Sequence, residues 1–333
     1  MREKEVSPEL VKLETNVSYI PYFGFCERLV DARGSNYPIK LRYIVKRIDV
    51  KREESCERFE NYYKISNEEI YYEEKLGLGI TLKMLINYKK LNMLVQPLYH
   101  KLIKFNIHCV SPPGAHLKDF LCLSLLERGF ATLHSSAFSY EDNGVIIVAP
   151  SNTGKTWSVF HAVKNFGCKF LSEDISIING KYVFGCPWTS TFIDSVNLKG
   201  YNRILQIVSE KLPVSRPFLR RYIRTEEVIG RERFASKAKI RLVFILKRGK
   251  KEVKNLNTEE ALIKILTLNR YEFSYCSGLV NALQFFGFIN IDDLLSKEEE
   301  IIRKTLETSN IYLLSGTPEF FVKKIESIFR EII

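Results

Sequence analysis

The chain has 333 residues, of which 45% are hydrophobic and 12% aromatic, and its net charge is +11. This composition excludes a disordered chain and supplies enough apolar surface for one large domain or two domains in close contact. The basic residues are spread along the chain, so they favour either a basic face that attracts an acidic peptide, a nucleotide or a nucleic acid, or general solubility.

Several other classes find no support in the sequence. No window approaches the roughly 18 apolar residues of a membrane helix, and the N-terminus has no apolar signal core, so we expect a cytoplasmic protein without a membrane partner. The seven cysteines are odd in number and form no Cys-x-x-Cys pair, which predicts reduced thiols rather than disulfides or a zinc site. No zinc-finger, helix-turn-helix or RNA-binding signature favours nucleic acid. A homo-oligomer is compatible with the sequence.

The first third of the chain is predicted to be β-rich. Residues 37–50 alternate as a strand, residues 51–61 are charged and predict a loop, and residues 62–107 contain short β-like segments separated by turn signals, which predict an antiparallel region. Residues 98–105 fit either a strand or a short helix. We therefore divide the chain into a β-rich N-terminal region, 1–110, and a nucleotide-binding region, 111–333.

The second region begins with alternating helices and strands. Residues 116–128 predict a buried helix, residues 131–140 a strand, and the Asn143-Gly144 dipeptide a hairpin into the next strand. A helix is expected over 157–166 and ends at Gly167. A strand then leads to Glu173 and Asp174 and to a second hairpin at Asn179-Gly180.

The rest of the chain is less regular at first. Residues 186–236 are rich in Pro, Ser and Arg, and they fit either a lid or substrate loop or a loop of solvated charges; their basic run is Arg216, Arg220, Arg221 and Arg224. Beyond it, the periodicity predicts strands over 240–246 and 311–314, and helices over 258–268, 273–288, 298–307 and 318–332.

The strongest motif follows the aliphatic run Val145–Val148. It reads Ala149-Pro150-Ser151-Asn152-Thr153-Gly154-Lys155-Thr156, and Trp157 opens a helix, so a strand, a tight loop with Gly-Lys-Thr and a helix follow one another. This is the context that a phosphate-binding loop requires, because the helix N-terminus points N–H groups and a positive dipole at one spot. We expect ATP on residues 149–157, with Lys155 on its phosphates and the Thr156 hydroxyl on Mg²⁺.

Two acids and a histidine are the candidates for chemistry beside this loop. Glu173 and Asp174 lie 18 and 19 residues after Lys155, and one of them can hold Mg²⁺ while the other accepts a proton from an attacking hydroxyl. Asp174 is our candidate metal ligand with Thr156. His134 lies on the strand that should pair with the loop strand, and it fits either a catalytic or a structural role.

These residues resemble the HPr kinase/phosphorylase-like family. The resemblance rests on Leu133-His134-Ser-Ser-Ala, on residues 144–156 and on Phe170-Leu-Ser-Glu-Asp174, and it extends more loosely over residues 98–333. It implies a phosphoenolpyruvate-carboxykinase-like nucleotide fold of the α/β class, and transfer of a phosphoryl group from ATP to a serine hydroxyl. By position it implies catalytic roles for Glu173, Asp174 and His134.

The sequence also departs from that family. The first acid is Glu173 where the family has Asp, Trp157 stands where the bacterial enzymes have Glu, and the glycine-rich segment associated with dephosphorylation is missing. We therefore do not expect HPr as the substrate or a phosphorylase activity.

Three hypotheses remain at this stage. The first is an ATP- and Mg²⁺-dependent kinase that acts on a hydroxyl of a peptide, a protein or a small metabolite. The second is a nucleotide-binding regulator or assembly factor without transfer chemistry. The third is a basic interaction protein whose loop is vestigial. The orientation of Glu173 and Asp174 relative to the loop distinguishes the first from the second.

Overall fold

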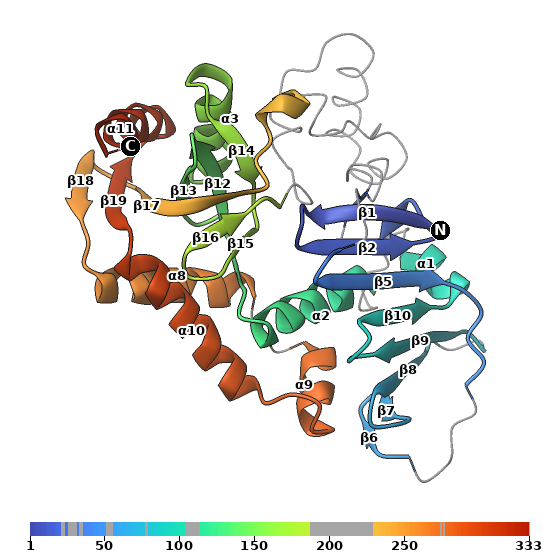
Figure 1. Ribbon diagram of the computed structural model, residues 1–333. Coiled ribbons are helices and arrows are strands. Elements are labelled where there is room, and N and C mark those ends of the chain that lie inside the picture. Colours follow the sequence, from blue (N-terminus) through green and yellow to red (C-terminus); the bar gives the residue numbers. More distant parts are fainter. Residues whose placement is uncertain are drawn as a thin grey trace.

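The computed structural model (Figure 1) describes residues 1–20, 24–25, 32, 36–50, 56–76, 79–103, 113–186, 229–273, 275 and 277–332. Residues 187–228, which make up most of the irregular stretch predicted over 186–236 and include its basic run, lie outside these residues. Within them, no helix has the length and apolar character needed to cross a membrane. The four cysteines that are described, Cys56, Cys122, Cys168 and Cys186, are all free thiols, as expected.

The N-terminal region forms a mixed sheet of eight strands. Its order is β1 (Arg2–Ser7), β2 (Val11–Thr15), β5 (Ile39–Val45), β10 (Asn92–Val95), β9 (Thr81–Asn87), β8 (Glu69–Lys75), β7 (Tyr62–Lys64) and β6 (Arg58–Phe59). The antiparallel region predicted after residue 62 is confirmed, whereas β5 pairs in parallel with both β2 and β10. The ambiguous stretch near residue 100 is a helix, α1 (Pro97–Ile103). β3 (Tyr19–Ile20) pairs antiparallel with β4 (Gly24–Phe25).

The second sheet has nine strands and surrounds the phosphate-loop strand. Along its main path the order is β11 (Ala131–Leu133), β15 (Ser176–Ile178), β16 (Tyr182–Phe184), β17 (Lys237–Arg248), β13 (Asn143–Val148), β12 (Ser135–Tyr140) and β14 (Lys169–Ser172). β19 (Asn310–Gly316) pairs with β17 and with β18 (Glu252–Asn255). Strands β13, β17 and β19 are parallel and the other pairs are antiparallel, so the expected mixed α/β class is confirmed.

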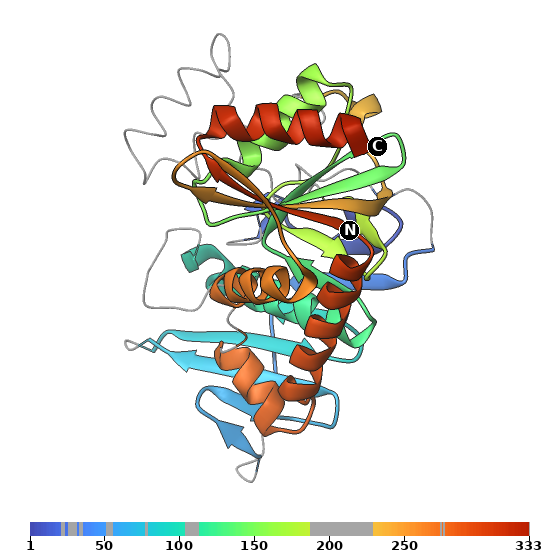
Figure 2. The same ribbon diagram turned by 90° about the vertical axis from the view of Figure 1, so that its left-hand side faces the viewer.

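Helices cover both faces of this second sheet, as Figure 2 shows. α3 (Lys155–Asn165) and α11 (Pro318–Ile332) lie on one face; α2 (Pro113–Glu127), α8 (Thr258–Glu272) and α10 (Ile291–Glu307) lie on the other, with α9 (Gly278–Phe285) below them. Because side chains alternate along a strand, Val145 and Ile147 pack with α3 and α11, whereas Ile146 and Val148 join the cluster that contains α2. A four-residue aliphatic run is therefore buried on both faces.

Helix α2 lies between the two sheets. Its buried apolar side chains belong to one cluster with residues of both sheets, and they are Leu117, Phe120, Leu121, Cys122, Leu123, Leu125 and Leu126. A helix that is apolar around most of its circumference must be buried on most sides. The burial that the sequence predicted for residues 116–128 is thus explained by the position of α2 between the two sheets.

Two details of the expected strands were wrong. The predicted strand over 131–140 is two strands, β11 and β12, which separate at His134. The hairpin between β12 and β13 exists, but Tyr140 pairs with Asn143, so its turn is Glu141-Asp142, and the Asn143-Gly144 dipeptide lies inside β13. Glu141 takes the left-handed conformation in this turn, with a φ of 52°.

The helix boundaries also differ from the expected ones. The helical stretch predicted over 273–288 is the shorter α9, and α10 begins at Ile291 rather than near residue 298. Side-chain caps explain both starts, because Ser277 and Asn290 accept hydrogen bonds from N–H groups of the first turns. α8 is capped in the same way by Asn257.

Gly144 has no room for a side chain. A Cβ atom there would lie 2.8 Å from Val183 Cγ1 and 3.3 Å from Ala238 Cβ. We expect Gly144→Ala to lower the free energy of unfolding by about 1–3 kcal/mol, because a close-packed sheet must shift to admit the methyl group. Urea denaturation measures the change. Gly249→Ala is the control, since its Cβ would lie 2.7 Å from the Ser315 Oγ alone, the end of a side chain that can rotate away; equal losses in the two variants would contradict this account.

His116 gives a second prediction, on pH. It is fully buried beside Tyr62 and Tyr72, neither ring nitrogen has a hydrogen-bond partner within the described chain, and burial lowers its pKa from 6.5 to about 4. The unfolded chain then binds more protons than the folded chain below pH 6.5, so stability falls as the pH drops. We expect a loss of about 2 kcal/mol by about pH 5 from this residue. His116→Leu should flatten the pH dependence in urea denaturation, and the control is His161→Leu on α3. An unchanged slope in His116→Leu would refute the assignment.

Candidate functional site

The predicted phosphate loop connects the end of β13 to the start of α3. Asn152 and Gly154 have φ values of 60° and 127°, and these two left-handed residues turn the chain into the helix. Gly154 is required there, because a Cβ would be strained at that φ and would lie 3.4 Å from Pro318. The first-turn N–H groups of α3 have no partner within the helix, so this helix N-terminus has the properties of an anion site.

The Lys155 side chain is buried at the base of this loop. Its Nζ donates to the Ala149 carbonyl at 2.7 Å and to His134 Nε2 at 2.8 Å, and only 6% of the residue is exposed. Burial lowers the pKa of Lys155, while the carboxylates of Asp174 and Glu272 act in the opposite direction. The sequence placed Lys155 on the phosphates; the structure shows the ammonium directed into a set of acceptors beside the loop.

The Thr156 hydroxyl contacts one of the two predicted acids. Thr156 Oγ1 donates to Glu173 Oε1 at 2.6 Å, and Glu173 is 2% exposed. The expected partner of Thr156 in metal binding was Asp174, but the structure brings Glu173 to this hydroxyl and turns Asp174 toward His134. The two acids thus lie in different surroundings although they are adjacent in sequence.

His134 and the acid pair occupy matching interruptions of two strands. β11 and β12 separate at His134, and Glu173 and Asp174 form a bend between β14 and β15. The Ser135 N–H donates to the Asp174 carbonyl at 3.1 Å, which holds the two interruptions side by side. Asp174 has a φ of 72°, so the chain turns sharply and its carboxylate reaches the histidine.

The contacts of His134 determine its tautomer. An ammonium can only donate, so His134 Nε2 accepts from Lys155 and the ring proton resides on Nδ1, whose nearest carboxylate oxygen is Asp174 Oδ1 at 3.5 Å. Burial and then the Lys155 charge lower the pKa of His134. The imidazole is therefore held neutral, with its proton directed toward Asp174.

Helix α8 contributes a third carboxylate that the sequence did not indicate. Glu272 Oε1 lies 3.6 Å from His134 Nε2 and accepts from the Ser151 hydroxyl at 3.3 Å. Glu272 is 98 or more residues from every predicted site residue, and nothing in its local sequence distinguishes it from a surface acid at the end of a helix. Only the packing of α8 under the second sheet brings it to the loop.

A buried network supports the interruption at His134. Asn269 Oδ1 accepts from the His134 N–H at 2.9 Å, and Asn269 Nδ2 donates to the Thr132 carbonyl and to Glu298 Oε1. Glu298 is fully buried, and the Tyr275 hydroxyl donates to it at 3.0 Å. Sequence reasoning missed both residues, because a lone Asn and Glu on separate helices carry no local signal.

The other residues predicted to bind the nucleotide lie at the rim of the loop. Pro150, Ser151 and Asn152 are exposed, Ala149 and Thr153 are buried, and the Arg248 guanidinium donates to the Asn152 carbonyl at 2.6 Å. Trp157 is 43% exposed and its ring contacts Phe160 and His161 of its own helix. The structure thus brings Lys155, Thr156, His134, Glu173 and Asp174 together and leaves Trp157 to one side.

The charges of this site fit a divalent cation bound with phosphates. Three carboxylates, Glu173, Asp174 and Glu272, face one ammonium, and oxygen donors are those that Mg²⁺ prefers. Among the described residues no group of three or more His, Cys, Asp or Glu side chains is arranged to hold a metal ion. Mg²⁺ beside a nucleotide, however, commonly takes only one or two protein oxygens together with phosphate oxygens, and Thr156 and Glu173 supply such a pair.

Comparison with known proteins identifies little. No protein-family model matches the chain, and no curated protein matches it. Among solved structures, the chain is similar to the Hpr(Ser) kinase/phosphatase from Coxiella burnetii, at 9% identity and a TM-score of 0.30, over 60% of this chain and 94% of that chain. This similarity is too low to transfer residue roles from one protein to the other.

The Asn269 network gives a prediction about stability. We expect Asn269→Ala to lower the free energy of unfolding by about 2–4 kcal/mol, because it leaves the His134 N–H, the Thr132 carbonyl and Glu298 without their buried partner. Urea denaturation at neutral pH measures the loss. The control is Asn165→Ala, which removes only an exposed hydrogen bond to His161; a loss no larger than in this control would contradict the network.

Proposed function

We propose that this chain transfers the γ-phosphoryl group of ATP to a hydroxyl group, a serine side chain of a peptide or protein or a hydroxyl of a small metabolite, with Mg²⁺ as cofactor. The observation that carries the proposal is the 2.6 Å hydrogen bond between Thr156 and Glu173 at the start of α3. A hydroxyl and a carboxylate in contact beside a Gly-Lys-Thr loop are the protein oxygens that nucleotide-bound Mg²⁺ requires. A phosphoenolpyruvate-carboxykinase-like topology is part of this proposal.

In this proposal Lys155 binds the phosphates. In the structure its ammonium donates to His134 and Ala149. The terminal phosphate oxygens carry more charge than either acceptor, so they would accept hydrogen bonds from this ammonium in their place. Thr156 and Glu173 would hold Mg²⁺, which would neutralise charge on the phosphates. The chain's own contribution is therefore to bind and orient the triphosphate at the end of β13.

Asp174 is the better candidate for the proton acceptor. Its side chain is 40% exposed, so an acceptor hydroxyl can reach it, whereas Glu173 is buried against Thr156. The hydroxyl proton passes to the Asp174 carboxylate as the oxygen attacks the γ-phosphorus and the bond to the β–γ bridging oxygen breaks, which releases ADP. The neutral His134, with its Nδ1 proton toward Asp174, orients this carboxylate.

The alternative, a nucleotide-binding regulator without transfer, differs in one respect. It requires ATP and Mg²⁺ to bind without any chemistry at Asp174. Both acids face the loop region, which favours the kinase, and the following experiment distinguishes the two.

We expect calorimetry to detect ATP binding in the presence of Mg²⁺, and labelled ATP to transfer its γ-phosphate to members of a serine-peptide and metabolite library. Lys155→Ala should abolish both, because it removes the cation on the phosphates. Asp174→Asn should retain ATP binding but reduce transfer about 100-fold or more, because it removes the proton acceptor. Glu173→Gln should weaken the Mg²⁺ dependence of binding.

The matched control for Lys155→Ala is Lys164→Ala, an exposed lysine on the same helix. It should leave binding and transfer unchanged. If wild-type protein binds ATP and never transfers phosphate, the chain is a nucleotide-binding regulator and not a kinase. If it does not bind ATP at all, the nucleotide site itself is refuted.

A further inference from the structure

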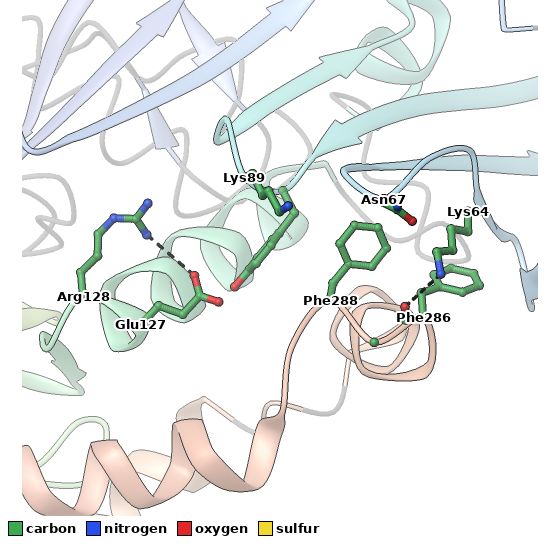
Figure 3. Close-up of a pocket in the computed structure, with 9 residues that line it drawn as sticks. Lys64, Asn67, Lys89, Glu127, Arg128, Phe286 and Phe288 are labelled. Carbon is green, nitrogen blue, oxygen red and sulfur yellow. Dashed lines mark hydrogen bonds and ion pairs between the residues drawn. The ribbon is translucent and has the colours of Figure 1, made fainter.

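A cavity lies where the two halves of the molecule meet. It has a volume of about 430 Å³ and is lined by Lys64, Asn67, Tyr88, Lys89, Glu127, Arg128, Phe286, Gly287 and Phe288. As Figure 3 shows, these residues come from the N-terminal sheet and its turns, from the C-terminal end of α2 and from the connection between α9 and α10. None of them belongs to the phosphate-loop site.

One side of the cavity is apolar. Phe286 and Phe288 flank Gly287 in the connection between α9 and α10, and Gly287 has a φ of 71° with nothing within 4 Å of its Cβ position. The left-handed turn brings two phenyl rings to the same cavity. Figure 3 shows the Phe288 ring between Asn67 and the end of α2. Such a surface fits a planar or otherwise apolar body.

The cations of the cavity have only weak partners. Three cations and one carboxylate line it. Lys64 Nζ lies 3.4 Å from Glu57 Oε2 and 3.3 Å from the Phe286 carbonyl, and Lys89 Nζ lies 3.9 Å from Glu68 Oε1. Ion pairs at such distances in an exposed position contribute little, so these ammonium groups are available to a better anion.

Arg128 is engaged more firmly. Its Nη1 donates to the Ser124 carbonyl at 2.9 Å and lies 3.8 Å from Glu127 Oε2. Arg128 thus partly offsets the single carboxylate that lines the cavity, and Lys64 and Lys89 remain as the two cations that a ligand can engage.

A buried hydroxyl completes the site. Tyr88 is 5% exposed, and its hydroxyl lies beside the Glu127 carboxylate. Burial raises the pKa of Tyr88 far above its usual value, and Glu127 acts in the same direction, so the group stays protonated and can donate. A ligand acceptor in the cavity would compete with Glu127 for this proton.

We propose that this cavity is a binding site for a small organic acid, a molecule with one carboxylate on an aromatic or similarly flat apolar body. The carboxylate binds to Lys89 and accepts from the Tyr88 hydroxyl, while the ring packs against Phe288, on whose other side Lys64 and Phe286 lie (Figure 3). The volume admits a ligand of this size and excludes a folded partner. The site is independent of the proposed nucleotide chemistry, because the two share no residue.

The test compares three probes of equal shape and different charge: phenylacetate, phenylacetamide and phenethylamine. We expect calorimetry on the full chain to show saturable binding of phenylacetate, with weaker binding of the neutral amide and none of the amine. The double variant with Lys64→Ala and Lys89→Ala should weaken phenylacetate binding about tenfold or more. Tyr88→Phe, which keeps the ring, should weaken it about fivefold.

Two controls make the result specific. Lys90→Ala changes an exposed lysine next to Lys89 that does not line the cavity, and it should leave binding unchanged. Lys155→Ala should also leave it unchanged, which separates this site from the phosphate loop. Circular dichroism verifies that each variant is folded. Equal binding of acid and amide, preferential binding of the amine, binding of no probe, or full affinity in the lysine double variant would each overturn the proposal.

Discussion

The site depends on the burial of one positive charge. The Lys155 ammonium is nearly inaccessible to water, and a buried ammonium is tolerated only where acceptors surround it. The fold supplies a carbonyl from the loop and the neutral His134 ring, with the carboxylates of Asp174 and Glu272 farther out. Each of these groups must be held in place, and much of the surrounding structure does so.

The interruptions of the two strands, at His134 and at Glu173-Asp174, hold these acceptor groups in place. A continuous strand through His134 would direct alternate side chains to opposite faces, and the histidine, Glu173 and Asp174 could not converge on the loop. The interruptions leave backbone groups without ladder partners, which must be satisfied inside the protein. Asn269 and the backbone of Ser135 and Asp174 satisfy them, and the buried Glu298 fixes Asn269 in turn.

The cavity that we propose as an organic-acid site arises from a different constraint. Two sheets share α2 between them, and their edges cannot close completely where turns and helix ends meet. The buried Tyr88 hydroxyl and the weakly paired lysines show that this space is polar on one side rather than simply unfilled. The two sites differ in chemistry, because one is formed by a helix N-terminus and a sheet edge, and the other by the junction of two layers.

The sequence alone determined the local order of elements around the loop. The strand at 145–148, the tight loop that contains Gly154 and the helix after it are consequences of residues adjacent in the chain, and so could be predicted. Tertiary structure decided which acid contacts Thr156 and where the strand divides at His134. It also decided the roles of Asn269, Glu272 and Glu298. These contacts join residues of separate helices and strands through packing, and no periodicity or spacing along the chain encodes them.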